Sequence, residues 1–179
     1  MTRRAVFLDR DGILVRTEVK DGKPYAPRTL ADFSLLPDAA PSCLALKRAG
    51  FALIVVTNQP DVGNGLVERS VVEAMHAQFR AALPLDSIKT CYHAQHEGCG
   101  CRKPEPGLLL EAAAEFDLNL GASFMIGDRW LDIAAGRRAG CYAILVDRGY
   151  AESVTVPPDA TVGTLEGAVQ VVLRQGACC

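Results

Sequence analysis

Aspartates recur in this sequence at places where three of them could act together. Asp9 and Asp11 stand two residues apart in the segment FLDRDG, and Asp128 follows the apolar run SFMIG. Side chains two residues apart in an extended segment point the same way, so Asp9 and Asp11 should face one point while Arg10 points elsewhere. Three carboxylates in one place repel one another unless a divalent cation lies between them. Oxygen ligands beside a phosphate are typical of Mg²⁺, so we expect Asp9, Asp11 and Asp128 to bind magnesium.

A hydroxyl and a cation complete a set suited to phosphoryl transfer, which needs positioning and charge neutralisation above all. Thr57 and Lys103 could surround the phosphoryl oxygens, and Gly12 permits the sharp turn that brings backbone amides close to an anion. Asp9 could attack phosphorus and form an aspartyl-phosphate. Asp11 could protonate the leaving alcohol and then take a proton from the hydrolytic water. Each motif alone is more often a turn or a helix cap, so their joint occurrence carries the hypothesis.

The elements expected to position these residues alternate along the chain. Apolar, β-branched runs predict parallel strands buried on both faces, and amphipathic segments predict helices. The strands are expected at 5–9, 51–58, 87–93, 123–128 and 142–147, and the helices at 38–49, 68–82, 105–117, 129–139 and 164–175. This order predicts a doubly wound, Rossmann-like α/β sheet in a single domain, 1–179. The candidate residues follow the strands, at the carboxyl edge where such sheets bind ligands.

Two stretches interrupt this alternation, a long polar insertion at 13–37 and a Cys/His-bearing loop at 94–104. The second supplies three thiols and one imidazole in two alternating pairs. These are Cys91, His93, Cys99 and Cys101. Together they form a complete tetrahedral set for structural Zn²⁺ in a loop spanning 91–101, with no open position for water. Its role would be to fold a polar loop and place Arg102 and Lys103, and the alternative is four side chains without metal.

The cysteines and the net charge limit the cellular compartment and the classes of partner that we expect. The start of the chain lacks the apolar core of a signal peptide, and the seven cysteines indicate thiols or a metal site in a reducing cytoplasm. We expect Cys43 and Cys141 to be buried thiols, and assign no function to Cys178 and Cys179. A net charge of −2 disfavours a nucleic-acid partner, including a zinc-dependent nucleic-acid module. No apolar run is long enough to span a bilayer, so no membrane association is expected.

Four segments together resemble the motifs of the haloacid dehalogenase superfamily of phosphatases. FLDRDG, VVTNQ, RKP and MIGDRWLDI match its first to fourth motifs within residues 5–149. The resemblance implies this superfamily's fold without a large cap domain. It implies Asp9 as nucleophile and Asp11 as acid/base, with Asp128 joining both on magnesium. It also implies that Thr57 and Lys103 stabilise the phosphoryl group.

Further roles follow from the same resemblance. Asn58, Arg102 and Arg129 would contact the rest of the substrate. Asp132, the second acid of the fourth motif, ranks below Asp128 as a metal ligand and could instead orient Lys103 or a metal-bound water. Residues 16–25, where substrate contacts should lie, match the superfamily poorly.

The sequence narrows the expected substrate to two types of phosphate ester. The loop CYHAQHEGCGCRKPEPG is similar to zinc loops of superfamily members that act on a heptose-type sugar bisphosphate or on histidinol phosphate. We favour the sugar bisphosphate, because Arg102 and Arg129 could hold a second phosphate. The five residues between His93 and Cys99 look closer to the histidinol type. A phosphate-accepting receiver module is a distant alternative, since its acceptor Asp follows the third strand. The partner expected is a small phosphorylated metabolite, bound by a monomer.

Overall fold

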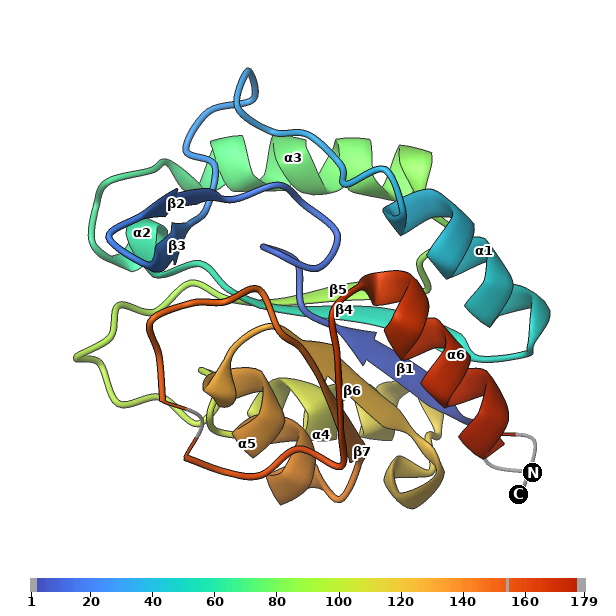
Figure 1. Ribbon diagram of the computed structural model, residues 1–179. Coiled ribbons are helices and arrows are strands. Elements are labelled where there is room, and N and C mark those ends of the chain that lie inside the picture. The colour runs from blue at the N-terminus through green and yellow to red at the C-terminus, as the bar shows by residue number, and fades with distance from the viewer. Residues whose placement is uncertain (1–2, 154, 177–179) are drawn as a thin grey trace.

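Parallel strands form the central sheet of the protein, as Figure 1 shows for a computed structural model that describes residues 3–153 and 155–176. The order across this six-stranded sheet is β5-β4-β1-β6-β7-β8. The strands are β1 (Ala5–Leu8), β4 (Ala52–Asn58), β5 (Ser87–Cys91), β6 (Phe124–Gly127), β7 (Tyr142–Val146) and β8 (Ala160–Val162). The predicted parallel α/β sheet is confirmed, with β1 between β4 and β6.

Helices cover both faces of this sheet (Figure 1). They are α1 (Ala39–Arg48), α2 (Pro60–Gly63), α3 (Arg69–Ala82), α4 (Gly107–Phe116), α5 (Trp130–Ala139) and α6 (Leu165–Gly176), with a 3₁₀ turn at Leu120–Ala122. Successive residues of β1 alternate between the two faces, as a period of two requires. Val6 and Leu8 pack on the side of α1 and α6, while Ala5 and Phe7 pack on the side of α4 and α5. Both faces of the sheet are therefore buried.

The register of the sheet brings the candidate residues to one edge. Leu8 pairs with Val55 of β4 and with Ile126 of β6. All three strands run in the same direction, so the residues that follow them emerge together at the carboxyl edge. The five predicted strands and five predicted helices are all present, and their ends lie within two residues of the predicted bounds. The sequence prediction missed α2 and β8.

The insertion at 13–37 differs from the prediction in two ways. It is not polar throughout, because Ile13, Leu14 and Val15 are fully buried in the core. It also contains an antiparallel hairpin of β2 (Glu18–Lys20) and β3 (Lys23–Tyr25), which forms a separate two-stranded sheet. Asp21 and Gly22 both have positive φ in its tight turn, the geometry for which Asp-Gly is favoured.

Cysteines outside the loop agree with the prediction where they are described. Cys43 and Cys141 are buried, and burial raises the pKa of each thiol to about 12. Cys178 and Cys179 lie outside the described residues. Among the described helices, none combines the length and apolarity needed to cross a membrane.

Candidate active site

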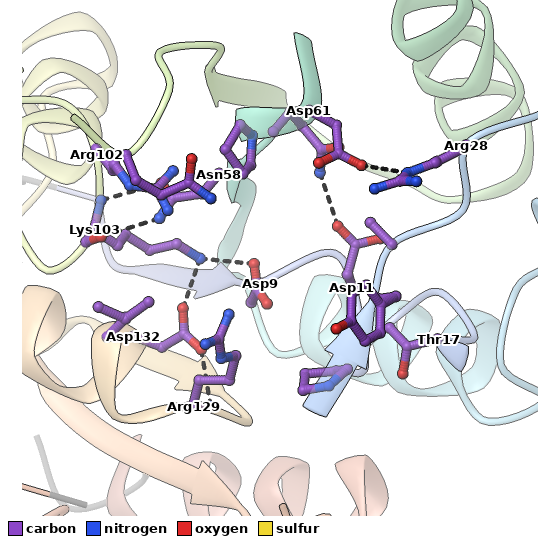
Figure 2. Close-up of a pocket in the computed structure, with 17 residues that line it drawn as sticks. Asp9, Asp11, Thr17, Arg28, Asn58, Asp61, Arg102, Lys103, Arg129 and Asp132 are labelled. Atoms are coloured by element: carbon purple, nitrogen blue, oxygen red, sulfur yellow. Dashed lines mark hydrogen bonds and ion pairs between the residues drawn. The ribbon is translucent and has the colours of Figure 1, made fainter. Parts of the chain in front are cut away.

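A pocket of about 340 Å³ opens at the carboxyl edge of the sheet (Figure 2). Its walls come from four distant parts of the sequence: the end of β1, the end of β4, the loop after β5 and the start of α5. The hairpin contributes Pro24 and Tyr25. The insertion therefore adds a wall beside groups that the sheet itself positions.

Lys103 is the central cation of this pocket. Its Nζ donates to Asp9 Oδ1 at 2.6 Å and to the Val56 carbonyl at 2.8 Å, and it lies 2.6 Å from Asp132 Oδ1. Figure 2 shows the three side chains converging. Lys103 is only 2% exposed. Burial opposes its charge, but Asp132 and Asp9 raise the pKa of Lys103 above its ordinary value, so it stays a cation.

Asn58 holds the backbone of Lys103. Its Nδ2 donates to the Lys103 carbonyl at 3.0 Å, and its Oδ1 accepts from the Lys103 amide at 3.1 Å. Asn58 lines the pocket, as a substrate contact would. Its amide is nevertheless occupied in joining the end of β4 to the loop after β5. Asn58 therefore positions Lys103, and its contact with substrate stays a prediction.

Three buried carboxylates lie close together at this edge. Side-chain oxygens of Asp9, Asp128 and Asp132 lie within 4.8 Å of one another. Burial, then repulsion from its neighbours, raises the pKa of Asp9 to about 7 and the pKa of Asp128 well above its usual range. Asp128 Oδ1 is buried and has no hydrogen-bond partner within the described chain. An unpartnered oxygen beside other desolvated carboxylates fits a hard divalent cation such as Mg²⁺.

The predicted set of magnesium ligands differs from this group at one position. The Asp11 carboxylate lies outside this group, and its Oδ2 accepts from Gln59 Nε2 at 2.8 Å. Figure 2 shows it pointing toward the side of the pocket where Asp61 lies. The physical reason is that the extended segment ends at Leu8 and the chain then turns, so the alternation rule stops applying. Arg10 does not point elsewhere either, since its Nη2 lies 2.9 Å from Asp11 Oδ1.

Asp132 takes the third place in the group, yet both its oxygens already have partners. Oδ1 pairs with Lys103, and Oδ2 accepts from the Arg129 amide at 3.1 Å, which caps α5. This agrees with the expectation that Asp132 orients Lys103. Tyr150 orients the neighbouring acid Asp128, because its hydroxyl donates to Asp128 Oδ2 at 2.7 Å.

Gly12 makes the close approach of these groups possible. Its φ is +86°, a conformation that favours glycine. A Cβ at this position would lie 1.8 Å from Asp128 Oδ2, so the space is closed to any other residue. The sharp turn predicted at Gly12 is confirmed.

Thr57 is fully buried at the end of β4. Its Oγ1 accepts from Gln59 Nε2 at 2.8 Å, which leaves its own hydrogen free to donate. Thr57 is not among the residues that line the pocket, so its contact with a phosphoryl oxygen stays a prediction.

The arginines of the pocket differ in how far their charge is already paired. Arg129 donates its Nε to Glu152 at 3.1 Å, and Arg28 donates its Nε to Asp61 at 2.7 Å. Arg102 lines the same pocket, and its buried Nη1 has no hydrogen-bond partner in the described part of the chain. Arg102 is therefore the arginine here with a buried donor left to bind an anion.

The loop after β5 brings its four candidate ligands together. Ligand atoms of Cys91, His93, Cys99 and Cys101 lie within 4.8 Å of one another. The Sγ atoms of Cys91 and Cys101 lie 3.6 and 3.4 Å from that of Cys99, and Cys101 Sγ lies 3.3 Å from His93 Nδ1. A tetrahedron with Zn–S bonds of about 2.3 Å has sulfur–sulfur edges of about 3.8 Å, close to these separations. The cluster could hold zinc.

Comparison with known proteins decides the family. A HAD-hydrolase-like family model matches residues 100–168. A D-glycero-β-D-manno-heptose-1,7-bisphosphate 7-phosphatase of Pseudomonas aeruginosa is 32% identical over 154 residues, covering 83% of this chain and 84% of the relative. The D-glycero-α-D-manno-heptose-1,7-bisphosphate 7-phosphatase of Burkholderia mallei is 36% identical over 152 residues, covering 78% and 77%. The chain belongs to the haloacid dehalogenase superfamily of phosphatases.

A solved structure extends this likeness to the whole fold. The D,D-heptose 1,7-bisphosphate phosphatase of B. bronchiseptica, complexed with magnesium and phosphate, superimposes with a TM-score of 0.83 at 26% identity. The match covers 96% of this chain and 99% of that one. The superfamily resemblance drawn from four short motifs is thus confirmed by sequence and by fold.

Several residues at the site of this superfamily member were missed from the sequence. Arg10 and Gln59 lie inside the matched motifs, but their types alone do not show that they contact Asp11. Tyr150 and Glu152 lie in the loop after β7, which carries no motif and gave no signal. They reach the site because that loop passes over the carboxyl edge, next to Gly12 and Arg129.

Proposed function

We propose that this phosphatase is magnesium-dependent and hydrolyses a sugar phosphate through a phosphorylated Asp9. The observation that carries the proposal is the setting of Asp9, which is 7% exposed, lines the pocket and is paired through Oδ1 with Lys103. Its neighbour Asp128 offers an unpartnered oxygen. We assign the metal to Asp9 and Asp128, where magnesium would supply positive charge to the phosphoryl oxygens.

In the first step, an Asp9 oxygen attacks phosphorus and the bond from phosphorus to the ester oxygen breaks. Lys103 and the Thr57 hydroxyl neutralise charge on the transferred group. Asp11 gives its proton to the departing oxygen, which leaves as the alcohol. In the second step, Asp11 takes a proton from water as that water attacks the phosphorus of the aspartyl-phosphate. Phosphate leaves, and the Asp9 carboxylate is regenerated.

For the substrate, we favour a heptose 1,7-bisphosphate over histidinol phosphate. The curated relatives above are named for that bisphosphate, and they cover more than three quarters of the chain. The unpartnered Nη1 of Arg102 supports a contact with a second, uncleaved phosphate. Arg129 supports it less than the sequence suggested, because Glu152 already neutralises its guanidinium.

Replacing Arg102 with Ala should raise KM for the bisphosphate by about 10- to 100-fold, as loss of a charge-assisted hydrogen bond would. For a monophosphate, KM should change much less. The measurement is kcat/KM on heptose 1,7-bisphosphate, fructose 1,6-bisphosphate and histidinol phosphate. Arg138→Ala removes an exposed arginine paired with Glu105 and serves as the control. A preference for histidinol phosphate would overturn the bisphosphate assignment while leaving the phosphatase intact.

We also propose that zinc is structural and magnesium catalytic. Dilute EDTA should then abolish activity quickly, and added Mg²⁺ should restore it while zinc stays bound in its closed thiolate site. Elemental analysis of Cys101→Ser should show loss of about one zinc equivalent, with lowered thermal stability. Cys43→Ala, which removes a buried thiol far from the loop, should keep its zinc. Finding no zinc in protein purified without chelators would refute the zinc assignment.

We further propose that residues 1–179 act as one domain, as a monomer in the cytoplasm, without a nucleic-acid or membrane partner. The buried, reduced thiols of Cys43 and Cys141 support a reducing compartment.

A further inference from the structure

Arg10 is fully buried, although its guanidinium is always charged. It follows the nucleophile directly and stands between the two acids that the reaction uses. A buried charge is tolerated only when it is paired and its donors are satisfied. The partners of Arg10 therefore show what its burial achieves.

The guanidinium contacts both oxygens of the Asp11 carboxylate through two of its nitrogens, in a bidentate fork. Nη2 lies 2.9 Å from Asp11 Oδ1, and Nε lies 3.0 Å from Oδ1 and 3.1 Å from Oδ2. Such a planar, multi-point contact fixes the orientation of a carboxylate in a way that a single point charge does not.

Gln59 closes the arrangement from the other side. Its Nε2 donates to Asp11 Oδ2 at 2.8 Å, and its Oε1 accepts from Arg10 Nη2 at 3.0 Å. The same Nε2 also reaches the Thr57 hydroxyl. Gln59 is 4% exposed, so solvent does not compete strongly for these bonds. Both Asp11 oxygens thus accept from fixed donors.

His76 of α3 anchors the far end of the guanidinium. Its Nε2 lies 3.4 Å from Arg10 Nη1 and must act as acceptor, since arginine only donates. Burial, followed by the charge of Arg10, lowers the pKa of His76 to about 4, so the ring is neutral near pH 7. Glu73, on the same helix, lies 4.0 Å from Nδ1, and the charges of Arg80 and Asp11 also act on the ring.

We infer that Arg10 is a positioning residue that holds the Asp11 carboxylate in line for proton transfer to the leaving group, with Gln59 and His76 fixing the guanidinium. The inference rests on the proposed function of Asp11 as acid/base. Proton transfer is sensitive to the placement of the donor, and a freely rotating carboxylate would lose that placement. Misplacing Asp11 should therefore slow the reaction only for leaving groups that must be protonated as they depart.

Two phosphate esters separate this role from a merely structural one. An alkyl phosphate, such as glycerol phosphate, must be protonated as it leaves, whereas the 4-nitrophenolate of 4-nitrophenyl phosphate leaves without a proton. The constant to compare is kcat/KM, because it covers the steps up to phosphoryl transfer and omits the hydrolysis step that both esters share. Arg10→Lys keeps the charge but removes the fork.

We expect Arg10→Lys to lower kcat/KM for the alkyl phosphate by about 10- to 100-fold, a partial loss of the roughly 10²- to 10⁴-fold that general acid catalysis contributes, and for 4-nitrophenyl phosphate by less than about 3-fold. Asp11→Asn should show the same selectivity, and adding Arg10→Lys to it should cause no further selective loss. Gln59→Met, which removes one donor to Asp11, provides a second variant if Arg10→Lys does not fold.

Equal losses on both esters would overturn the inference, because they would show that Arg10 only supports the fold. Unchanged kcat/KM on both would overturn it as well. His76→Gln keeps a hydrogen-bond acceptor, so its loss of kcat/KM should favour 4-nitrophenyl phosphate over the alkyl phosphate less than the loss in His76→Leu does. The reverse order would contradict the anchoring role. A wild-type protein that cleaves neither these esters nor heptose 1,7-bisphosphate would overturn the proposed function, and this inference with it.

Discussion

Asp9→Asn should lower kcat by on the order of 10⁴-fold or more, as removal of a covalent nucleophile does. The amide keeps the shape of the side chain but loses the charge that attacks phosphorus in the proposed mechanism. The fold should survive, because the change removes a carboxylate that burial already disfavours and whose pKa is raised to about 7. Steady-state turnover and thermal unfolding, measured on the same preparation, test both statements.

The matched control is Asp117→Asn. Asp117 is exposed at the end of α4, in a left-handed conformation that asparagine also accepts. Its carbonyl accepts from the Arg3 amide, ahead of β1 and so at the opposite edge of the sheet. Its replacement should leave turnover unchanged. Near-normal activity of Asp9→Asn would contradict the covalent mechanism.

Lys103→Met should cost both stability and activity. It leaves the buried carboxylates of Asp9 and Asp132 without their shared cation, and breaking a buried pair in this way costs about 3–5 kcal/mol in free energy of unfolding. Loss of the cation next to the transferred phosphoryl group should also lower kcat/KM by about 10³-fold or more. Chemical denaturation and kinetics measure the two effects.

The loss of stability should depend on pH in a defined direction. Without Lys103, the pKa of Asp9 should rise further above its unfolded value, so the folded state binds more protons than the unfolded chain. The variant should therefore gain stability as the pH falls from 8 towards 6. Lys47→Met is the control, since Lys47 Nζ lies at a similar 2.7 Å from Asp86, but its side chain is 33% exposed. It should cost less than about 1 kcal/mol.

Much of the fold could be predicted from the sequence, because buried parallel strands carry their signal locally. β4 is apolar over consecutive positions, which no exposed strand would be. The insertion was predicted less well. Its hairpin could have been found from Asp21-Gly22, but its three buried residues follow the segment FLDRDG without any helical or alternating pattern.

The site divides in the same way. Asp9, Asp128 and Lys103 follow strands or a strand-linked loop, so the topology of the sheet placed them correctly. The orientation of Asp11 could not be predicted, because it depends on Arg10 being buried against Gln59, which follows β4, and His76 of α3, both distant in sequence. Tyr150 was out of reach for the same reason. Such contacts arise from tertiary packing, and a local pattern does not encode them.

The separate two-stranded sheet of β2 and β3 has an evolutionary consequence. No strand of the central sheet is hydrogen-bonded to it among the described residues. Its contacts with the rest of the site include a hydrogen bond that the Ala151 amide donates to the Gly22 carbonyl. An ion pair between Arg28 and Asp61 lies beside it. Such a hairpin can diverge in length and side chains while the hydrolytic groups remain in register. Enzymes descended from one ancestor could thus change the metabolite that they bind through changes in this hairpin alone.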